Sequence, residues 1–279
     1  MTAMSSAEIS EPEPGILTLT FDRDEKLNAV TPEMTRCVWE ALAALSDRDD
    51  LRCLVLTANG RYYSAGIDLA FGAGNRPPDP ATAHVHPGWS YRRNYRSHHL
   101  LYDEMEAIEK PIVLAAQGTV LGWGVETAAS CDFRFCTPRA KWGVPEVHLG
   151  ALAGSGGTSR LTRLVGAHWG KWMAMAGEQV TAEEAVAIGL VHRVFPEETF
   201  LDDVYAFCRR IMAVPAETLG LAKLVVDMSA DVQDRTVQRH IDRIANTALS
   251  NGSAEVLART ERFRKGRVPK GWQQPTDAL

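Results

Sequence analysis

The sequence lacks three features, each of which would indicate a particular partner or cellular location. Its formal net charge is -5 and its pI is about 5.9, so no overall positive field would attract DNA or RNA. It contains no run of about 18 uninterrupted apolar residues, the length that a membrane-spanning helix needs. The first fifteen residues have neither the basic start nor the apolar stretch of a secretory signal. We therefore expect a cytoplasmic protein that binds neither nucleic acid nor a membrane.

Cysteine is scarce and is not arranged for cross-linking. The five cysteines are odd in number, and no two of them form a C-x-x-C pair. This usage favours reduced thiols in a reducing compartment over a disulfide framework or a zinc site.

What the sequence does contain is typical of a globular α/β protein. With 279 residues, 45% of them hydrophobic, the chain can bury a substantial core. Apolar runs of strand length alternate with helix-like segments, which indicates βα units and a mostly parallel sheet. The predicted strands cover residues 15–21, 52–58 and 111–118.

The sequence predicts two helix N-termini, and a change from strand patterns to helix patterns indicates a boundary between two regions. Thr31 followed by Pro32 predicts a helix N-terminus, and Thr181 with Glu184 predicts a capping box. Strand patterns fade after residue 200, where residues 201–213, 216–229 and 233–249 are predicted to be helical. We predict a core over residues 1–198 and a helical region over residues 199–279.

Two segments share a layout of apolar strand, small-residue turn and helix start. One contains Ala65-Gly66-Ile67-Asp68 and the other contains Gly122-Trp123-Gly124. Each should present backbone N–H groups at a helix start, where the helix dipole also favours negative charge. Two such ends that face one point would form an oxyanion hole for a carbonyl compound. The indole of Trp123 would then be free to line a pocket, unless it simply packs in the core.

Two glutamates are candidates for acid and base chemistry. Glu126 stands in an apolar helical stretch, and Glu146 follows twenty residues later after a strand and a turn. Two carboxylates that share an apolar pocket cannot both ionise easily, so one stays protonated and the other activates water. The simpler interpretation is that Glu126 only complements the helix dipole.

These motifs, in this order, resemble the crotonase superfamily, the enoyl-CoA hydratase and isomerase family. The matching segments cover most of the chain: residues 26–30, 54–69, 110–135, 141–166, 177–196 and 262–272. The resemblance implies a spiral of ββα units followed by a C-terminal helical trimerisation region. It also implies a homotrimer or a hexamer, an acyl-CoA substrate, and no metal or other cofactor.

The resemblance also implies roles for individual residues. The backbone N–H groups of Ile67 and Trp123 would form the oxyanion hole, and Glu126 and Glu146 would be the catalytic pair of a hydratase. The implied reaction adds water to an enoyl-CoA and gives a 3-hydroxyacyl-CoA. Coenzyme A would contact Lys26, Leu27, Ala29, Ala65, Asp68, Leu69 and Phe263.

The sequence departs from the family where the acyl group should bind. Trp123 and Trp142 replace smaller or different side chains, and the long segment before Lys110 carries Arg92, Arg93, Arg96, His98 and His99. We therefore expect an acyl group that is aromatic, cyclic or polar. An enoyl-CoA isomerase and an acyl-CoA hydrolase of the same superfamily remain alternatives.

Three readings outside this family are also open. Ser155 in a nearly complete nucleophile-elbow motif, with His192 or His240 downstream, would suit a serine hydrolase. The histidine pairs 84/86 and 98/99 could bind a metal. A non-catalytic scaffold that kept the fold is the third.

Overall fold

A computed structural model describes residues 6–71, 98–252 and 254–265. The chain forms two compact units, each of which is described here by itself. The first unit comprises Met1–Ile108 and Ile112–Val204, and it holds every strand of the described residues. The second comprises Glu109–Pro111 and Tyr205–Leu279. The predicted α/β class is confirmed.

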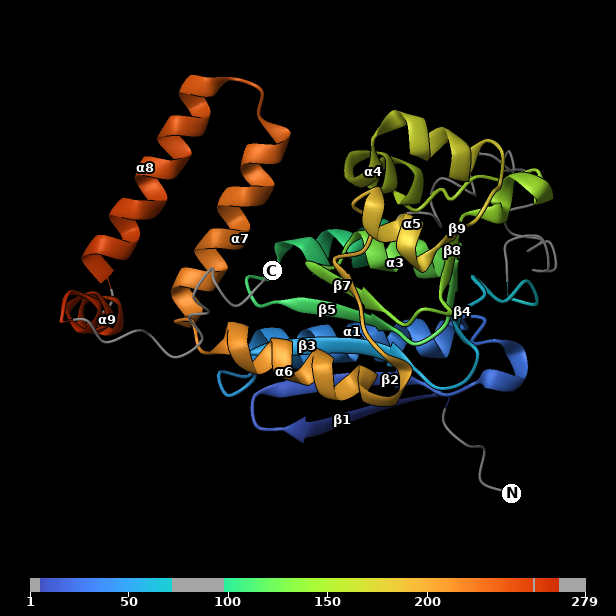
Figure 1. Ribbon diagram of the computed structural model, residues 1–279, viewed down its shortest axis with the longest axis horizontal. Coiled ribbons are helices and arrows are strands. Elements are labelled where there is room, and N and C mark those ends of the chain that lie inside the picture. The colour runs from blue at the N-terminus through green and yellow to red at the C-terminus, as the bar shows by residue number, and fades with distance from the viewer. Residues whose placement is uncertain (1–5, 72–97, 253, 266–279) are drawn as a thin grey trace, which may run out of the picture. The chain divides into compact units, whose positions relative to one another are not determined.

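Two sheets build the first unit (Figure 1). The larger has the order β1-β2-β3-β5-β7-β10, and the smaller has the order β4-β6-β8-β9. Among the strand pairs of the described residues, only β1–β2 and β8–β9 are antiparallel. The strands of the larger sheet are Ala7–Glu13, Ile16–Phe21, Cys53–Ala58, Ile112–Ala116, Phe133–Cys136 and Arg193–Val194. Those of the smaller sheet are Tyr62–Ser64, Thr119–Leu121, Lys141–Gly143 and Val180–Thr181.

The chain repeats one pattern three times as it crosses between the sheets. In the pairs β3–β4, β5–β6 and β7–β8, the first strand joins the larger sheet and the second joins the smaller sheet. Both β3 and β5 are buried along their whole length, as parallel strands covered on both faces should be. Because β4, β6 and β8 are parallel neighbours, the turns that follow them meet at one edge.

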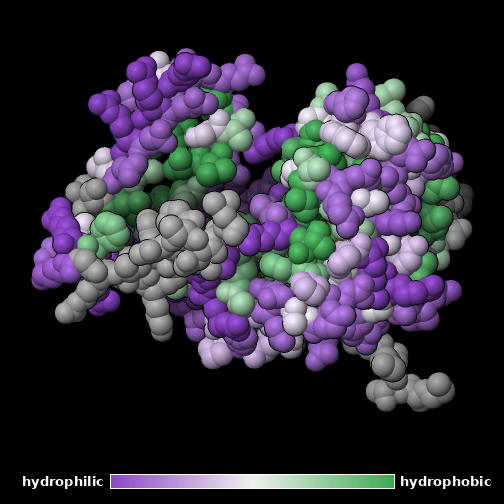
Figure 2. Space-filling view, in the orientation of Figure 1, coloured by the Kyte–Doolittle hydropathy of each residue, from purple (hydrophilic) through white to green (hydrophobic). Residues whose placement is uncertain are grey.

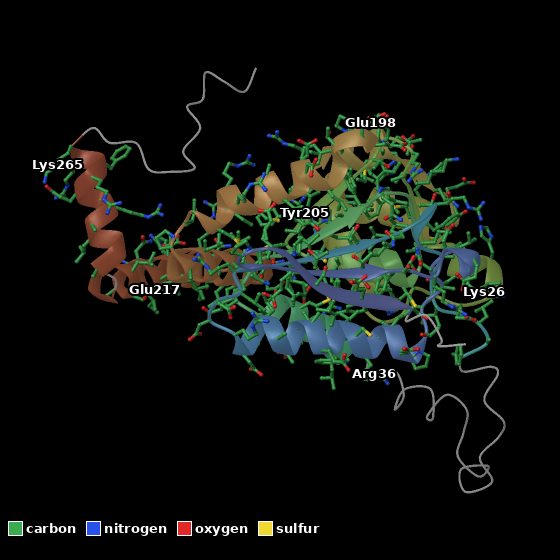
Figure 3. The ribbon with its side chains drawn as sticks, turned by 90° about the horizontal axis from the view of Figure 1, so that it is seen from below. Lys26, Arg36, Glu198, Tyr205, Glu217 and Lys265 are labelled. Carbon is green, nitrogen blue, oxygen red and sulfur yellow. The ribbon has the colours of Figure 1, made fainter. Side chains whose placement is uncertain are left out.

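Helices that the capping residues predict lie where expected. Helix α1 (Pro32–Asp47) begins with Thr31, whose side chain accepts a hydrogen bond from Met34 N. It packs on β1, β2 and β3 through its buried apolar stripe, while Arg36 stays on the outer face (Figure 3). Helix α5 (Ala182–Ala187) has the predicted capping box of Thr181 and Glu184.

The acidic, proline-bearing leader was not expected to form a strand, but it forms β1. Residues Ala7–Glu13 pair antiparallel with β2 at the edge of the larger sheet. Pro12 is tolerated there because an edge strand leaves one row of backbone groups without a partner strand. Acidic and polar side chains are accepted because most of β1 is exposed.

Helices make up the second unit and the end of the first. They are α6 (Phe200–Met212), α7 (Ala216–Asp231), α8 (Arg235–Gly252) and α9 (Ala254–Arg264). The first three match the predicted helical segments, whereas the sequence did not predict α9 as a separate helix. None of the described helices is both long and apolar enough to cross a membrane.

Arg134 on β7 fixes the end of the short helix α3 (Trp123–Ala129). Its buried guanidinium donates to the carbonyls of Ala128 (3.2 Å), Cys131 (2.5 Å) and Leu190 (2.7 Å). Arg134→Met would remove this donor from all three buried carbonyls, of which Ala128 O would keep the hydrogen bond from Cys131 N (3.1 Å). We expect it to lower the free energy of unfolding by about 2–4 kcal/mol, measured by urea denaturation.

The matched control is Arg139→Met. Arg139 is exposed and donates to Gln117 O (2.7 Å) at the surface. Its loss should cost about 0.5 kcal/mol or less. Equal effects of the two substitutions would show that Arg134 does not anchor α3.

Candidate active site

Three turns at the shared edge of the smaller sheet bring the predicted residues together. Ile67 follows β4, Trp123 follows β6, and Glu146 follows β8. The strands that carry them pair in parallel, with Tyr62 opposite Thr119 and Val120 opposite Trp142. Residues distant in the sequence are therefore adjacent because consecutive ββα units are stacked in register.

The N–H groups of Ile67 and Trp123 are both available to a ligand. Val30 N donates to Gly66 O (2.8 Å) and Asp68 N donates to Val30 O (3.0 Å), so the N–H of Ile67 points away from Val30. Trp123 is the first residue of α3, where an N–H has no acceptor within the helix. Neither group has an acceptor among the described residues.

The two turns that carry these N–H groups lie against each other. A methyl group placed on Gly66 would lie 3.9 Å from Trp123 N and 3.8 Å from Gly122 Cα. Ile67 directly follows Gly66, so the two N–H groups lie in adjoining turns. Two donors in such an arrangement can bind one carbonyl oxygen and stabilise the negative charge that it gains in a reaction.

Gly122 is required by both its backbone and its neighbour. Its φ of +52° and ψ of -116° suit glycine alone, and a methyl group there would lie 2.6 Å from Glu146 Oε1. The Glu146 carboxylate therefore rests directly on the turn that precedes α3.

Glu126 lies in the first turn of α3 and is almost completely buried, with 3% of its surface exposed. Ser155 N donates to its Oε1 at 2.8 Å. Burial raises the pKa of Glu126 to about 7, the Ser155 amide opposes this rise, and the negative charge of Glu146 adds to it. Near neutral pH this carboxyl group can therefore both accept and donate a proton.

Glu146 lies in the short helix η3 (Pro145–Leu149) after β8. Its Oε2 is buried and has no hydrogen-bond partner among the described residues. Burial also raises the pKa of Glu146. Because Glu146 touches Gly122 and Glu126 is four residues further along, the two acids lie at the same end of α3, where four residues span about 6 Å.

The indoles of Trp123 and Trp142 are buried. That of Trp123 has 1% of its surface exposed and packs between Phe21 (ring centroids 6.0 Å apart) and Tyr102 (6.4 Å). Trp142 is fully buried on β8. The Nε1 atom of Trp123 is buried without a hydrogen-bond partner in the described part of the chain, whereas the indole of Trp142 interacts with the thiol of Cys136. A role for either ring in acyl binding stays a prediction.

Most of the residues predicted to bind coenzyme A lie on two paired segments. Ala65 N donates to Leu27 O (2.9 Å), and Arg23 Nη1 donates both to Ala29 O and to Asp68 Oδ2, each at 2.8 Å. Lys26 and Leu69 are exposed beside them, and Figure 3 shows Lys26 at the surface. Phe263 lies on α9 in the second unit and is exposed. Coenzyme A binding by these residues stays a prediction.

The turn at residues 153–157 has a function that the sequence did not reveal. Its small residues suggested a nucleophile elbow, but its amides hold the carboxylate of Glu126. A methyl group on Gly157 would lie 2.7 Å from Glu126 Oε1. The cluster of glycines around Ser155 was the available signal, because only small residues let a backbone approach a buried carboxylate so closely.

The rival readings have less structural support. The turn that contains Ser155 follows η3, not a strand, so the strand-turn-helix context of a nucleophile elbow is missing. His192 accepts a hydrogen bond from Arg134 N (3.1 Å) and packs between Phe133 and Phe135. The other histidine, His240, is on α8 in the second unit. His84, His86, Arg92, Arg93 and Arg96 lie outside the described residues.

Comparisons with known proteins show the family and the fold of the chain. The family profile described as Enoyl-CoA hydratase/isomerase matches residues 11–255. Crotonyl-CoA hydratase of Syntrophomonas wolfei is 33% identical over 84% of each chain. The 1,2-epoxyphenylacetyl-CoA isomerase of Escherichia coli is 31% identical over 94% of this chain and 97% of its own. The crystal structure of enoyl-CoA hydratase from Thermoplasma volcanium has 27% identity and a TM-score of 0.81, covering 94% of this chain and 98% of its own.

Proposed function

Because the chain belongs to the enoyl-CoA hydratase/isomerase family, we propose that it is a hydratase. It adds water across the 2,3 double bond of an enoyl-CoA thioester and releases a 3-hydroxyacyl-CoA. The observation that carries this proposal is the presence of two glutamates at one end of α3, the buried Glu126 and the half-buried Glu146. A pair of acids suits the addition of water, in which one proton must leave the water and another must reach carbon.

In the proposed mechanism the thioester oxygen accepts hydrogen bonds from Ile67 N and Trp123 N. Water adds its oxygen to C3, and the electrons of the double bond move toward the thioester, whose oxygen gains enolate character. The two N–H donors stabilise this charge more strongly than the neutral carbonyl, which lowers the barrier. The proton that then adds to C2 restores the thioester carbonyl.

The two carboxyl groups divide the proton transfers. Glu126, whose carboxylate is held by Ser155 N, orients the water and accepts a proton from it. Glu146 is the principal acid and base, and its Oε2 has no partner in the described residues to compete with water or substrate. Because the pair is coupled, its titration belongs to both groups together.

The pH dependence of the reaction should show the ionisation of this pair. Burial raises the pKa of Glu126 to about 7, so Glu126 is mostly protonated below that pH and cannot accept a proton. We expect kcat/KM to fall about tenfold per pH unit below a midpoint close to 7. Stopped-flow or steady-state rates across the pH range measure it. A rate that is constant between about pH 5.5 and 7.5 would contradict the assignment of Glu126 as base.

The acyl group is proposed to be aromatic, cyclic or polar. Trp123 carries a buried Nε1 atom without a protein acceptor in the described residues, and such a donor suits an acyl group that has an oxygen. The relatives support a range of acyl groups, since one has a name that refers to crotonyl-CoA and another to 1,2-epoxyphenylacetyl-CoA.

A panel of enoyl-CoA substrates tests the activity. The panel contains straight-chain, aromatic and carboxylated acyl groups, and mass spectrometry identifies the products. We expect a gain of one water, with the highest kcat/KM on an aromatic or oxygen-bearing substrate. An unchanged mass with a shifted double bond would identify an isomerase, release of free coenzyme A would identify a hydrolase, and no turnover would favour a scaffold. Highest activity on a saturated-tail C16 substrate would contradict the proposed acyl class.

The protein is proposed to assemble as a homotrimer, or as a hexamer made of two trimers. Its proposed location is the cytoplasm. The helices of the second unit carry exposed apolar side chains, which are those of Val226, Met228, Val237, Ile244, Leu257 and Phe263. Figure 2 shows hydrophobic surface among the hydrophilic surface of these helices. Such a surface favours association with other protein. A monomer in light scattering would contradict this proposal.

A further inference from the structure

Arg160, in the first turns of α4 (Gly157–Ala174), is tied to a helical segment of a distant part of the chain. Its side chain has 12% of its surface exposed. Nε and Nη2 donate to the two carboxylate oxygens of Glu106 at 2.8 and 2.9 Å, and Nη2 also donates to Asp103 at 2.7 Å. Glu106 and Asp103 lie in the helical residues 98–107. The guanidinium is also 5.7 Å from the ring centre of Tyr102.

The same guanidinium lies against the turn that holds Glu126. Gly156 has a φ of +92°, and a methyl group there would lie 2.0 Å from Arg160 Nη1. Arg160 N also donates to Gly156 O at 2.8 Å. The residue before Gly156 is Ser155, whose amide donates to Glu126. We propose that Arg160 is a positioning residue, which holds the 153–157 turn in place and sets the electrostatic environment of Glu126.

The charges around Glu126 come from three other elements. Glu146 faces it from η3, Arg160 from α4, and the phenol of Tyr102 from residues 98–107. His99 lies next to the same turn, 3.6 Å from a methyl group placed on Gly156. Arg160 is the cation among these contacts, and its charge lowers the pKa of Glu126 against the larger effect of burial. Glu106 partly neutralises Arg160 and so weakens this effect.

Two substitutions should therefore move the titration of Glu126 in opposite directions. Arg160→Met removes the positive charge and should raise the midpoint by about 0.5 pH unit, whereas Glu106→Gln leaves that charge less neutralised and should lower it similarly. Arg160→Lys, which keeps the charge, should stay near the wild-type midpoint. Arg163→Met, one turn further along α4 and exposed, is the matched control and should change nothing.

The midpoint is measured on the full-length protein without substrate. Infrared titration records the band of the protonated carboxylic acid, which is assigned to Glu126 by its loss in Glu126→Gln. The importance of this midpoint for catalysis rests on the proposed hydratase function, but its measurement does not. If the panel shows no hydration, the infrared result still decides whether Arg160 acts on Glu126.

The midpoints of the two variants distinguish an effect of the Arg160 charge and position from a general loosening of the turn at residues 153–157. A loosened turn would weaken the bond from Ser155 N and raise the midpoint in both Arg160→Met and Glu106→Gln. Equal directions, or no change in Arg160→Met, would overturn the proposal. If Arg160→Met does not fold, Arg160→Lys and Glu106→Gln still give the comparison. In the active enzyme, kcat of Arg160→Met should fall about 10- to 100-fold, with a smaller change in KM.

Discussion

Glu146→Gln is expected to lower kcat for enoyl-CoA hydration by about 10³-fold or more, with a change in KM below about fivefold. Glutamine keeps the size of the side chain but cannot accept or release the proton that the reaction transfers. The buried Oε2 of Glu146 has no partner in the described residues, so the substitution disturbs no protein hydrogen bond of that atom. The loss should therefore be chemical, and steady-state kinetics on the best substrate of the panel measure it.

Glu126→Gln provides the companion measurement. Its amide oxygen can still accept from Ser155 N, so the turn at residues 153–157 keeps its anchor. We expect a loss of about 10²- to 10⁴-fold in kcat and the disappearance of the acidic limb near pH 7. The double variant should lose little more than the worse single variant, because residues that act as one unit are not additive.

The stability of the Glu126→Gln variant should not fall with its activity. Burial of Glu126 raises its pKa, which shows that the folded protein disfavours its charged form. Replacement of Glu126 by a neutral amide should leave the thermal midpoint of unfolding unchanged or raise it. Glu104→Gln on the exposed face of residues 98–107 is the control and should affect neither stability nor activity.

A Glu146→Gln enzyme with more than about a tenth of wild-type kcat would contradict the acid and base assignment.

Trp123→Pro is expected to lower kcat by about 10²- to 10³-fold, because proline has no N–H to donate to the thioester oxygen. Position 123 is the first residue of α3, the helix position that accepts proline best. The substitution therefore removes a donor without breaking the helix, although it also removes the indole from its place between Phe21 and Tyr102.

Trp123→Gly separates the two losses, since it removes the indole but keeps the N–H. It should retain most of kcat on small substrates and change the preference among acyl groups. The comparison between the glycine and proline variants, both with kcat measured on the same short enoyl-CoA, isolates the amide. Equal and mild effects of the two substitutions would show that the Trp123 amide is not used.

The sequence predicts local structure well where a local cause determines it. Thr31 caps α1 and the pair Thr181 and Glu184 caps α5, because capping depends on residues within one turn. The buried strands β3 and β5 are clear because no charged side chain interrupts them. Strand β1 was missed because edge position, and not its own composition, allows an acidic segment with Pro12 to pair.

The candidate site shows more clearly what the sequence alone does not predict. Spacing and resemblance named Ile67, Trp123, Glu126 and Glu146, but only the parallel pairing of β4, β6 and β8 places their turns side by side. That pairing joins residues that are tens of positions apart, and no local pattern encodes it. Arg160 is a stronger example, since its partners lie more than fifty residues earlier in the sequence, with |i−j| of 54 for Glu106 and 57 for Asp103.

A crystal structure with a bound 3-hydroxyacyl-CoA tests the central claim most directly. We expect the thioester oxygen to lie about 3 Å from both Ile67 N and Trp123 N, with the 3-hydroxyl group within hydrogen-bond distance of Glu126 and Glu146. A thioester oxygen bound by neither N–H group, or a 3-hydroxyl group out of reach of both carboxylates, would contradict it.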